Sequence, residues 1–273
     1  MRAFPAVAIS DARLMHLLDR LIRGTYGRQR FQGLYRRAHN LALTGLNYGY
    51  ADPVLNGEYA FLDRISKTWD ENPVVLDVGA FHGAWSAAVL ERASSATVHA
   101  FEPVPKSFAM LATNLDKMAE VHMCAVGATA GNAEMFAPAA VGELASLHAR
   151  DLSSFSLAPE SIGVVPVRTL DDFSAERGIT HIDLVKLDTE GHELSVLAGA
   201  ARLLETGAID ALQFEFGGAS LDARVFLRDI VGTLRPTYEV FRVLRDGLEL
   251  VRMDEREEIF TYANFVALSR GVV

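Results

Sequence analysis

The sequence predicts an α/β protein with a doubly wound, mostly parallel, seven-stranded Rossmann-like sheet, preceded by a helical N-terminal arm. Three observations favour this fold class. Short apolar runs alternate with helix-like segments from residue 73 onward. The runs are almost continuously apolar, as in strands that helices bury on both faces of a parallel sheet. Half of the 273 residues are hydrophobic, which excludes disorder for most of the chain because this content can bury a large core.

Residues 1–54 are predicted to form the arm. Residues 11–23 repeat leucines at helical spacing with arginines on the other faces, and residues 29–43 continue a helical pattern. Residues 44–57 contain glycine, asparagine and proline turn formers and are expected to be a loop. Helical spacing resumes at residues 59–69. We therefore expect one α/β domain over residues 55–273, with the arm as its accessory.

Seven strands are predicted after the arm, with helices between most of them. The strands are expected at residues 74–78, 97–101, 121–126, 182–187, 211–216, 238–244 and 262–268. The helices are expected at residues 84–92, 106–118, 193–204 and 223–234. Polar and turn residues separate the last two strands, which predicts a closing antiparallel hairpin. Residues 128–170 fit no strand–helix unit and are interpreted as an insertion with one or two short strands, one of them at 164–167.

Charge is unevenly distributed along the chain. The net charge is −9, but residues 1–50 hold eight basic and two acidic residues, so they carry +6 and the remainder carries −15. An acidic body would repel phosphates, so we expect no nucleic-acid partner. The basic arm is expected to pack on the acidic body; a lid over the acceptor pocket, a homodimer arm and a helix on anionic lipid are the alternatives.

Cysteine content and hydropathy favour a cytoplasmic protein. Cys124 is the single cysteine, so no disulfide can form within the chain, as is usual in a reducing compartment. No apolar run approaches the ~18–20 residues of a membrane span. The N-terminus also lacks the sustained apolar segment of a signal peptide.

The first predicted strand ends in a glycine-rich turn. The sequence from Val74 to Gly83 forms a strand, a turn and the start of a helix, and ligands of open α/β sheets bind at such strand ends. Phe81 and Ala84 stand where a dinucleotide fingerprint requires glycine, so a phosphate cradle is disfavoured. The second strand ends at Glu102, where a carboxylate can accept both ribose hydroxyls of a nucleoside.

This combination of strand, turn, helix and terminal glutamate resembles the cofactor half of class I S-adenosylmethionine-dependent methyltransferases. The resemblance implies a nucleoside cofactor without phosphate. It also implies that Cys124 and Ala125, at the end of the third strand, lie near the adenine.

A second polar cluster follows the fourth predicted strand. Lys186 lies within this apolar strand and must be paired, because an unpaired buried ammonium costs several kcal/mol. Asp188 and Glu190 follow at the carboxyl end of the strand, and Glu215 ends the next one. These carboxylates are either lysine partners or Mg²⁺ ligands, and we favour a network without metal. Zinc is not expected, because no second histidine completes a His-Glu-x-x-His motif.

Four motifs together resemble the FkbM family of methyltransferases over residues 45–270. They are Asn56-Gly57-Glu58, Asp77-Val78-Gly79-Ala80, Thr169-Leu170-Asp171 and the string from Lys186 to Glu193. The family often has asparagine after Gly-Ala in the first turn, where this chain has Phe81, and His82 is the candidate to replace its polar contacts.

The resemblance implies an O-methyltransferase that uses S-adenosylmethionine and acts on a hydroxyl of a small metabolite or sugar. The residues it implies for catalysis are Asp188, Glu190 and His192. Those it implies for the cofactor are Glu58, Asp77, Gly79, Ala80, Phe81, His82, Gly83, Glu102, Pro103, Cys124, Ala125 and Asp188. The alternatives are a catalytically silent scaffold on the methyltransferase fold and an NAD-dependent oxidoreductase.

Overall fold

The computed structural model describes residues 20, 22–138, 144–153 and 156–270. The chain divides into two compact units, Met1–Leu46 and Asn47–Val273, and each is described separately. Most of the helix predicted at residues 11–23 lies outside the described residues. No helix within the described ranges is long and apolar enough to cross a membrane.

The first unit contains the helix that was predicted from residue 29. A 3₁₀ turn, η1 (Gln29–Phe31), leads into α2 (Gln32–Gly45). The hydroxyls of Thr25 and Tyr35 lie 2.5 Å apart and connect the preceding turn to this helix.

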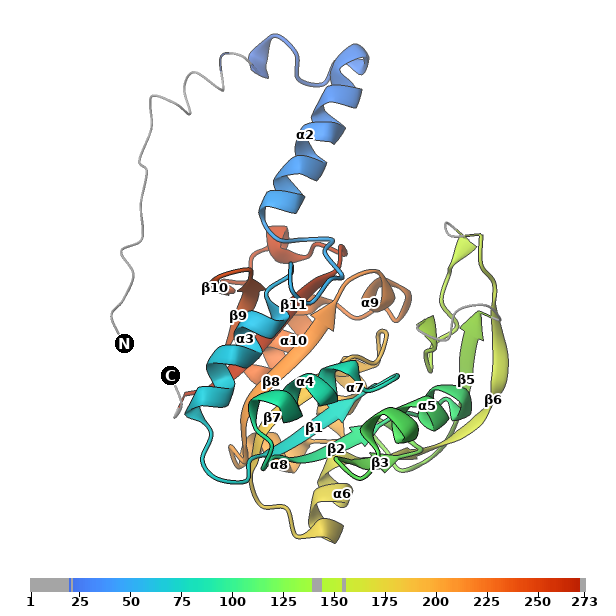
Figure 1. The fold of residues 1–273 in the computed structure, drawn as a ribbon. Helices are drawn as coiled ribbons and strands as arrows, with labels where there is room; N and C mark the ends of the chain where they lie inside the picture. The colour runs from blue at the N-terminus through green and yellow to red at the C-terminus, as the bar shows by residue number, and fades with distance from the viewer. Residues whose placement is uncertain (1–19, 21, 139–143, 154–155, 271–273) are drawn as a thin grey trace. The chain divides into compact units, whose positions relative to one another are not determined.

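The second unit is built on an eight-stranded sheet with the order β10-β9-β11-β8-β7-β1-β2-β3 (Figure 1). Strands β3, β2, β1, β7 and β8 run parallel, and β11 is antiparallel to both β8 and β9. The doubly wound, mostly parallel sheet is therefore confirmed, and β9 and β11, the two strands expected to close it as a hairpin, pair antiparallel. The sheet has eight strands and not the predicted seven, because β10 is added at its edge. The strands are β1 (Val74–Val78), β2 (Thr97–Phe101), β3 (Glu120–His122), β7 (Ile182–Leu187), β8 (Ile209–Phe216), β9 (Tyr238–Leu244), β10 (Gly247–Leu250) and β11 (Ala263–Ser269).

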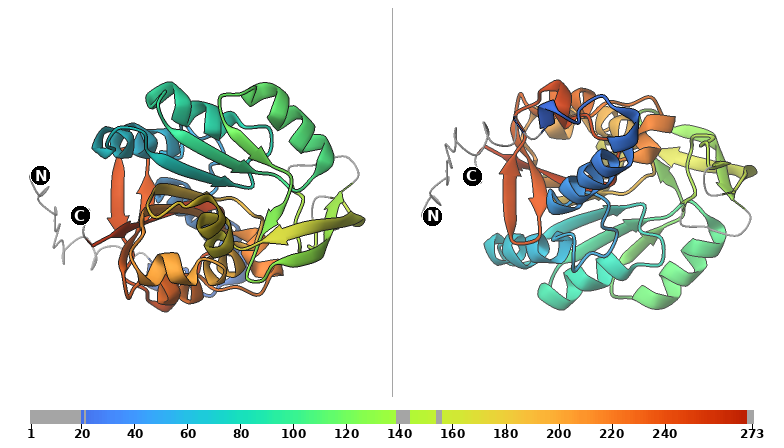
Figure 2. Two further views of the ribbon diagram at one scale, coloured as in Figure 1. Left: turned by 90° about the horizontal axis from the view of Figure 1, so that it is seen from below. Right: turned by 90° about the horizontal axis from the view of Figure 1, so that it is seen from above.

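Helices cover both faces of this sheet, as Figure 2 shows from below and above. One face carries α3 (Glu58–Ile65), α4 (Ala84–Arg92) and α5 (Pro105–Leu115). The other carries α6 (Leu170–Arg177), α7 (Glu193–Ala198), α8 (Ala201–Glu205) and α10 (Leu227–Leu234). The remaining helical elements are η2 (Ser66–Thr68), α9 (Gly218–Asp222) and η5 (Glu255–Glu257).

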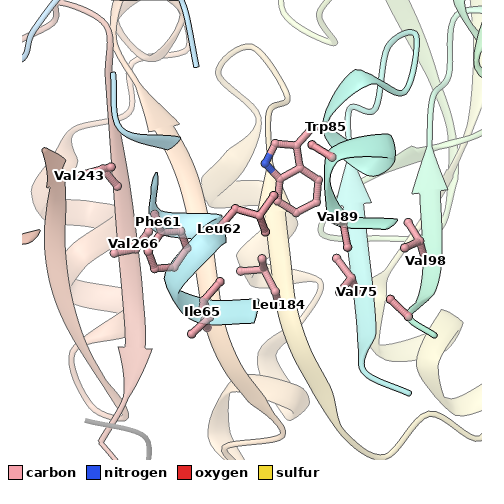
Figure 3. Packing of buried hydrophobic residues seen from close by; sticks show 13 residues of the cluster. Phe61, Leu62, Ile65, Val75, Trp85, Val89, Val98, Leu184, Val243 and Val266 are labelled. Atoms are coloured by element: carbon pink, nitrogen blue, oxygen red, sulfur yellow. The ribbon is translucent and has the colours of Figure 1, made fainter. Parts of the chain in front are cut away.

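The core beneath α3 and α4 explains why these segments are helical. Phe61, Leu62 and Ile65 recur on one side of α3 and are buried with Trp85 of α4 (Figure 3). They pack on inward-facing strand residues such as Leu184, which is fully buried. Helix α3 is thereby fixed beside the carboxyl ends of the strands, where Glu58 begins it.

The insertion forms a second sheet of three strands in the order β4-β6-β5. Strands β5 (Gly131–Pro138) and β6 (Pro159–Arg168) form a long antiparallel ribbon, and β4 (Ala125–Val126) pairs with β6. Both ribbon strands are longer than the sequence pattern indicated, because their outer faces are exposed and carry no apolar alternation.

Three segments differ from the sequence prediction. The strand expected at 121–126 splits, because β3 extends the large sheet and β4 joins the small one. The helix expected at 193–204 breaks at Gly199, where a Cβ would lie 2.1 Å from the carbonyl oxygen of Gly127. Strand β10, in the segment expected to be polar loop, is a mostly exposed edge strand that pairs with β9.

Candidate active site

Two adjoining cavities open at the carboxyl ends of the parallel strands. The larger measures about 310 Å³ and the smaller about 210 Å³. Both are lined by the turn after β1 and by the ends of β7 and β8. The residues they share are Ala51, Gly79, Phe81, Asp188, Glu215 and Tyr262.

The turn after β1 requires glycine for a steric reason. Gly79 has φ of +86°, and a Cβ at this position would lie 1.9 Å from the carbonyl oxygen of Asp188. The amides of Gly79 and Ala80 donate to the carbonyl oxygen of Phe101 at 3.0 and 2.9 Å. The backbones that follow β1 and β7 therefore lie in close contact where the two cavities share their lining.

Glu102 lies at the end of β2, where the sequence predicted it. Its two carboxylate oxygens accept hydrogen bonds from the amides of Phe81 (3.0 Å) and Val104 (2.8 Å). The residue is 5% exposed, and burial raises the pKa of its carboxyl group to about 7. Each oxygen keeps free lone pairs, so the side chain can still accept from a ligand in the larger cavity.

A buried ion network underlies the smaller cavity. The ammonium of Lys186 lies 2.7 Å from Asp188 Oδ2 and 3.7 Å from Glu58 Oε1. The pairing expected for this lysine is thus present. Asp77, its neighbour on β1, accepts from Ser86 Oγ at 2.6 Å through Oδ2, while its buried Oδ1 has no partner. Burial raises the pKa of Asp77 to about 6.

Glu215 and Tyr262 form a second polar group on the shared wall. The Tyr262 hydroxyl lies 2.7 Å from Glu215 Oε1 and accepts from Asn264 Nδ2 at 3.2 Å. Because the amide donates to the tyrosine oxygen, the tyrosine proton is directed to the carboxylate. Burial, reinforced by the charge of Asp188, holds the pKa of Glu215 well above its usual range.

The loop after β7 is closed by its own glutamate. Glu193 Oε1 accepts from the amide and hydroxyl of Thr189, both at 3.0 Å, and from the amide of Gly191 at 3.2 Å. This arrangement holds Glu190 at φ of +53°, an unusual conformation for a residue with a side chain. Glu193 therefore sets the shape of the loop that follows β7.

A segment of the insertion is fastened to this loop. Ser146 Oγ donates to the carbonyl of Glu190 at 2.8 Å, and His148 Nε2 lies 3.1 Å from His192 Nδ1. Arg150, with a side chain only 9% exposed, pairs with Glu190 at 2.5 Å. It also pairs with Asp222 of α9 at 3.4 Å. Sequence reasoning did not identify these insertion residues, because no spacing connects them to a motif 40 residues away.

The proposed site residues are distributed over both cavities, with Gly83 as the exception. Asp188, Glu190 and His192 all line the larger cavity. Glu102, Pro103, Cys124 and Ala125 line it as well, whereas Glu58, Asp77, Ala80 and His82 line the smaller one. Gly83 lies behind the turn, where a Cβ would come within 2.8 Å of Leu111.

The Thr169-Leu170-Asp171 motif lines neither cavity. Thr169 Oγ1 accepts from the amide of Asp172 at 3.0 Å and caps α6. The Asp171 carboxylate accepts from the amides of Arg202 and Leu203 at 2.9 and 3.1 Å in α8. This motif therefore ties two helices together on one face of the sheet.

Metal-ligand geometry occurs away from the cavities. Within the described ranges, two groups of side chains bring ligand atoms within 4.8 Å of one another. They are His99 with Glu120 and His122, and His181 with Asp183 and Asp210. The set weighed from the sequence, Asp188 with Glu190 and Glu215, is not among them.

Comparison with known proteins gives one family. Residues 77–236 match the methyltransferase FkbM domain. The chain is 26% identical to 2-O-methyltransferase NoeI of Sinorhizobium fredii over 191 residues, covering 65% of this chain and 77% of that protein. It is 35% identical to 31-O-demethyl-FK506 methyltransferase FkbM of Streptomyces tacrolimicus over 153 residues, covering 46% and 58%.

Among solved structures, the chain is similar to a TehB-like SAM-dependent methyltransferase from Corynebacterium glutamicum. The sequences are 14% identical, the TM-score is 0.42, and the match covers 88% of this chain and 98% of that one.

Proposed function

The chain belongs to the FkbM family of methyltransferases, and from this membership we propose an S-adenosylmethionine-dependent O-methyltransferase. Its acceptor is a hydroxyl of a small metabolite or sugar. The names of two relatives, a 2-O-methyltransferase and a 31-O-demethyl-FK506 methyltransferase, support transfer to oxygen. The observation that carries the proposal is the bare Gly79 turn facing Glu102 in one cavity, since this pair suits a nucleoside without phosphates.

The donor groups in the two cavities fit this cofactor. Glu102 retains acceptor capacity for ribose hydroxyls, and Cys124 with Ala125 offers an apolar wall beyond it. The smaller cavity is acidic, with Glu58 and the unpartnered Asp77 Oδ1, which suits the cationic amino group of a methionine moiety. A side chain at residue 79 would overlap the backbone carbonyl of Asp188, a residue that lines both cavities.

When bound, S-adenosylmethionine supplies an electrophilic methyl group on a cationic sulfur. The residues of this chain must align an acceptor oxygen with that group at about 3 Å and exclude water. Asp188 lines both cavities and is held in place by Lys186, so we assign it to positioning at their junction. The fastened insertion segment, with Ser146 and Leu147, supplies the opposite wall.

The acceptor hydroxyl must also lose a proton, and four side chains of the larger cavity are candidates for the base. Asp188 is paired with Lys186 at 2.7 Å. Glu190 is paired with Arg150, but burial outweighs this partner and raises the pKa of Glu190 to about 7, which suits a base near neutral pH. Burial lowers the pKa of His192 to about 4, which makes this imidazole a weak base. Glu215 has no cation within ion-pair distance in the described part of the chain. We add it as a candidate base to the three residues assigned from the sequence.

Titration calorimetry tests the cofactor assignment. We expect one S-adenosylhomocysteine per chain, no binding of NADH, and at least tenfold weaker binding in Glu102→Ala. The matched control is Glu134→Gln, a change on the exposed face of β5 that should leave affinity unchanged. Binding of NADH alone would establish the oxidoreductase alternative.

Methyl transfer is tested with S-adenosylmethionine and a panel of hydroxylated sugars and polyketides. Mass spectrometry should find one added methyl on oxygen, absent when the target hydroxyl is removed from the acceptor. Methylation of nitrogen or carbon would refute the O-methyltransferase. Tight cofactor binding without turnover on any acceptor would favour the silent scaffold.

A further inference from the structure

Two histidines and a glutamate meet at the β2–β3 edge of the large sheet, outside both cavities. His99 of β2 is paired in register with Glu120 of β3, and Phe101 is paired with His122. Because strand side chains alternate between faces, His99, Glu120 and His122 must lie on the same face. The intervening Ala100 and Val121 pack on the opposite face beneath α5, which agrees with this alternation. Strands β2 and β3 and helix α6 lie together in Figure 1.

We infer that these three side chains form a binding site for a divalent transition-metal ion, zinc in the first instance. His99 Nδ1 lies 3.3 Å from His122 Nε2 and 3.7 Å from Glu120 Oε2. Tetrahedral zinc with bonds of about 2.0–2.1 Å separates neighbouring ligand atoms by roughly 3.3–3.4 Å. His99 Nδ1 therefore lies at nearly the required spacing from both partner atoms, and all three ligand atoms lie within 4.8 Å of one another.

The ligand types of His99, Glu120 and His122 indicate which metal ion this site would prefer. Two imidazoles and one carboxylate suit zinc, nickel or cobalt, whereas magnesium prefers oxygen ligands and retained water. The ring of Phe173 stands nearly perpendicular to both histidine rings, with centroids 5.2 Å from His99 and 5.0 Å from His122. This packing fixes the ring planes. The Glu120 side chain is 53% exposed, so a water molecule can complete the coordination.

Arg177 of α6 is the competitor for this site. Its guanidinium pairs with Glu120 in the structure. The pair is a surface one, with side chains 39% and 53% exposed, so it offers little resistance to an incoming divalent ion. A carboxylate has several lone-pair positions, so Glu120 can serve the ion and the arginine together. The arginine charge still repels a cation, and removing it must strengthen binding.

The site is connected to the larger cavity by backbone contacts. The carbonyl oxygen of His122 accepts from the amides of Glu102 and Cys124, both at 3.0 Å. Both of these residues line the cavity. An ion that fixes His122 therefore also stabilises the edge of the sheet on which the cavity wall is built.

The experiment uses the full chain, with any affinity tag removed and metal stripped, titrated with ZnCl₂ at about pH 8. We expect one ion per chain with a dissociation constant near or below micromolar, and a rise of several degrees in melting temperature. Cobalt should give the visible absorption of a tetrahedral site. His122→Asn and Glu120→Gln should each weaken binding roughly 10–100-fold. Arg177→Gln should tighten it several-fold.

The second cluster provides the matched control. His181→Asn removes an exposed histidine beside Asp183 and Asp210 and should leave zinc affinity unchanged. Glu120→Gln changes an exposed side chain, so it remains informative if His122→Asn fails to fold. The proposal is overturned by an absence of binding at 100 μM zinc, by binding that survives both ligand substitutions, or by binding that His181→Asn abolishes. None of these outcomes depends on methyl transfer.

Discussion

At the scale of the residue, Glu102 combines a binding role with a cost in stability. Its pKa is raised from 4.5 in the unfolded chain to about 7 in the folded one. The folded state therefore binds more protons between these values, and stability falls as the pH rises through this window. The charged form of Glu102 therefore costs stability above neutral pH, although both of its oxygens accept amide hydrogen bonds.

The stability of Glu102→Gln relative to wild type is therefore predicted to rise by about 1–3 kcal/mol from pH 5 to pH 8, because only the wild-type side chain loses a proton over this range. At both pH values the side-chain nitrogen of glutamine cannot accept, so the variant lacks one of the two hydrogen bonds from the amides of Phe81 and Val104. Urea unfolding at both pH values measures the difference. A difference that shrinks between pH 5 and pH 8 would show that burial does not raise this pKa.

Gly79→Ala is predicted to lose several kcal/mol of stability, because its Cβ would overlap the carbonyl oxygen of Asp188 in a left-handed conformation. Cofactor binding should fall with it. The control is Gly232→Ala in α10, where a Cβ meets nothing within 4 Å and should be neutral or stabilising by up to about 1 kcal/mol. Chemical denaturation of both variants measures these changes in stability. If Gly79→Ala were as stable as Gly232→Ala, the close approach of residue 79 to the Asp188 carbonyl would be contradicted.

The candidate site was predictable from sequence where a residue lies on a strand end. Glu102 and Asp188 follow apolar runs, Lys186 lies near the end of one, and the carboxyl ends of parallel strands must meet. Arg150 and Tyr262 reach the same cavity region through tertiary contacts, which no local period encodes. The histidine pair at the sheet edge was not predicted, for the same reason. A zinc motif is recognised by ligands at short spacing along the sequence, whereas His99 and His122 come together because their strands pair side by side.

At the scale of the element, the insertion segment around residues 144–153 depends on Arg150. Arg150→Gln leaves the carboxylates of Glu190 and Asp222 without their cation in a largely buried place. We predict a loss of roughly 3 kcal/mol and a higher KM for the acceptor, with smaller effects on cofactor affinity. The control is Arg228→Gln, which removes an exposed guanidinium from Glu258. The Glu258 carboxylate still accepts from the amides of Leu227 and Arg228, so the unfolding midpoint should barely move.

Hydrogen exchange locates the effect of Arg150→Gln. Protection should be lost over residues 144–153 and over the loop that follows β7, while α4 and β1 keep theirs. An even loss of protection across the whole second unit would mean that Arg150 supports only the global stability and has no local effect on the insertion segment.

Whether a segment is a helix or a strand was predictable from the spacing of its apolar residues. Where the predicted boundaries were wrong, the error has a physical cause. Helix 84–92 was placed correctly, because its apolar spacing and its glycine start agree. The break between α7 and α8 arises from contact with Gly127, seventy residues earlier, which lies outside any local window. The ribbon of β5 and β6 was underestimated because exposed strands need no apolar alternation.

At the scale of the whole molecule, the chain consists of two compact units whose roles can be tested separately. Among the residues that the structure describes, all those that line either cavity lie in the second unit, from Ala51 onward. We propose that the arm is an accessory and that the second unit carries cofactor binding by itself. Deleting residues 1–46 should leave S-adenosylhomocysteine affinity within about threefold of the full chain, measured by calorimetry. Loss of cofactor binding would assign the arm to the site, whereas loss of turnover alone would assign it to the acceptor.

The position of β11 has a consequence for how the chain reaches its fold. Of the described strands it is the last in sequence, yet it lies between β8 and β9 in the interior of the sheet. On the ribosome, β8 and β9 therefore emerge with unpaired edges that only a later segment can join. Until then, each presents a hydrogen-bonding edge to any other chain nearby. A nascent protein of this design is exposed to mispairing until translation has passed residue 269, and its dependence on chaperones should peak there.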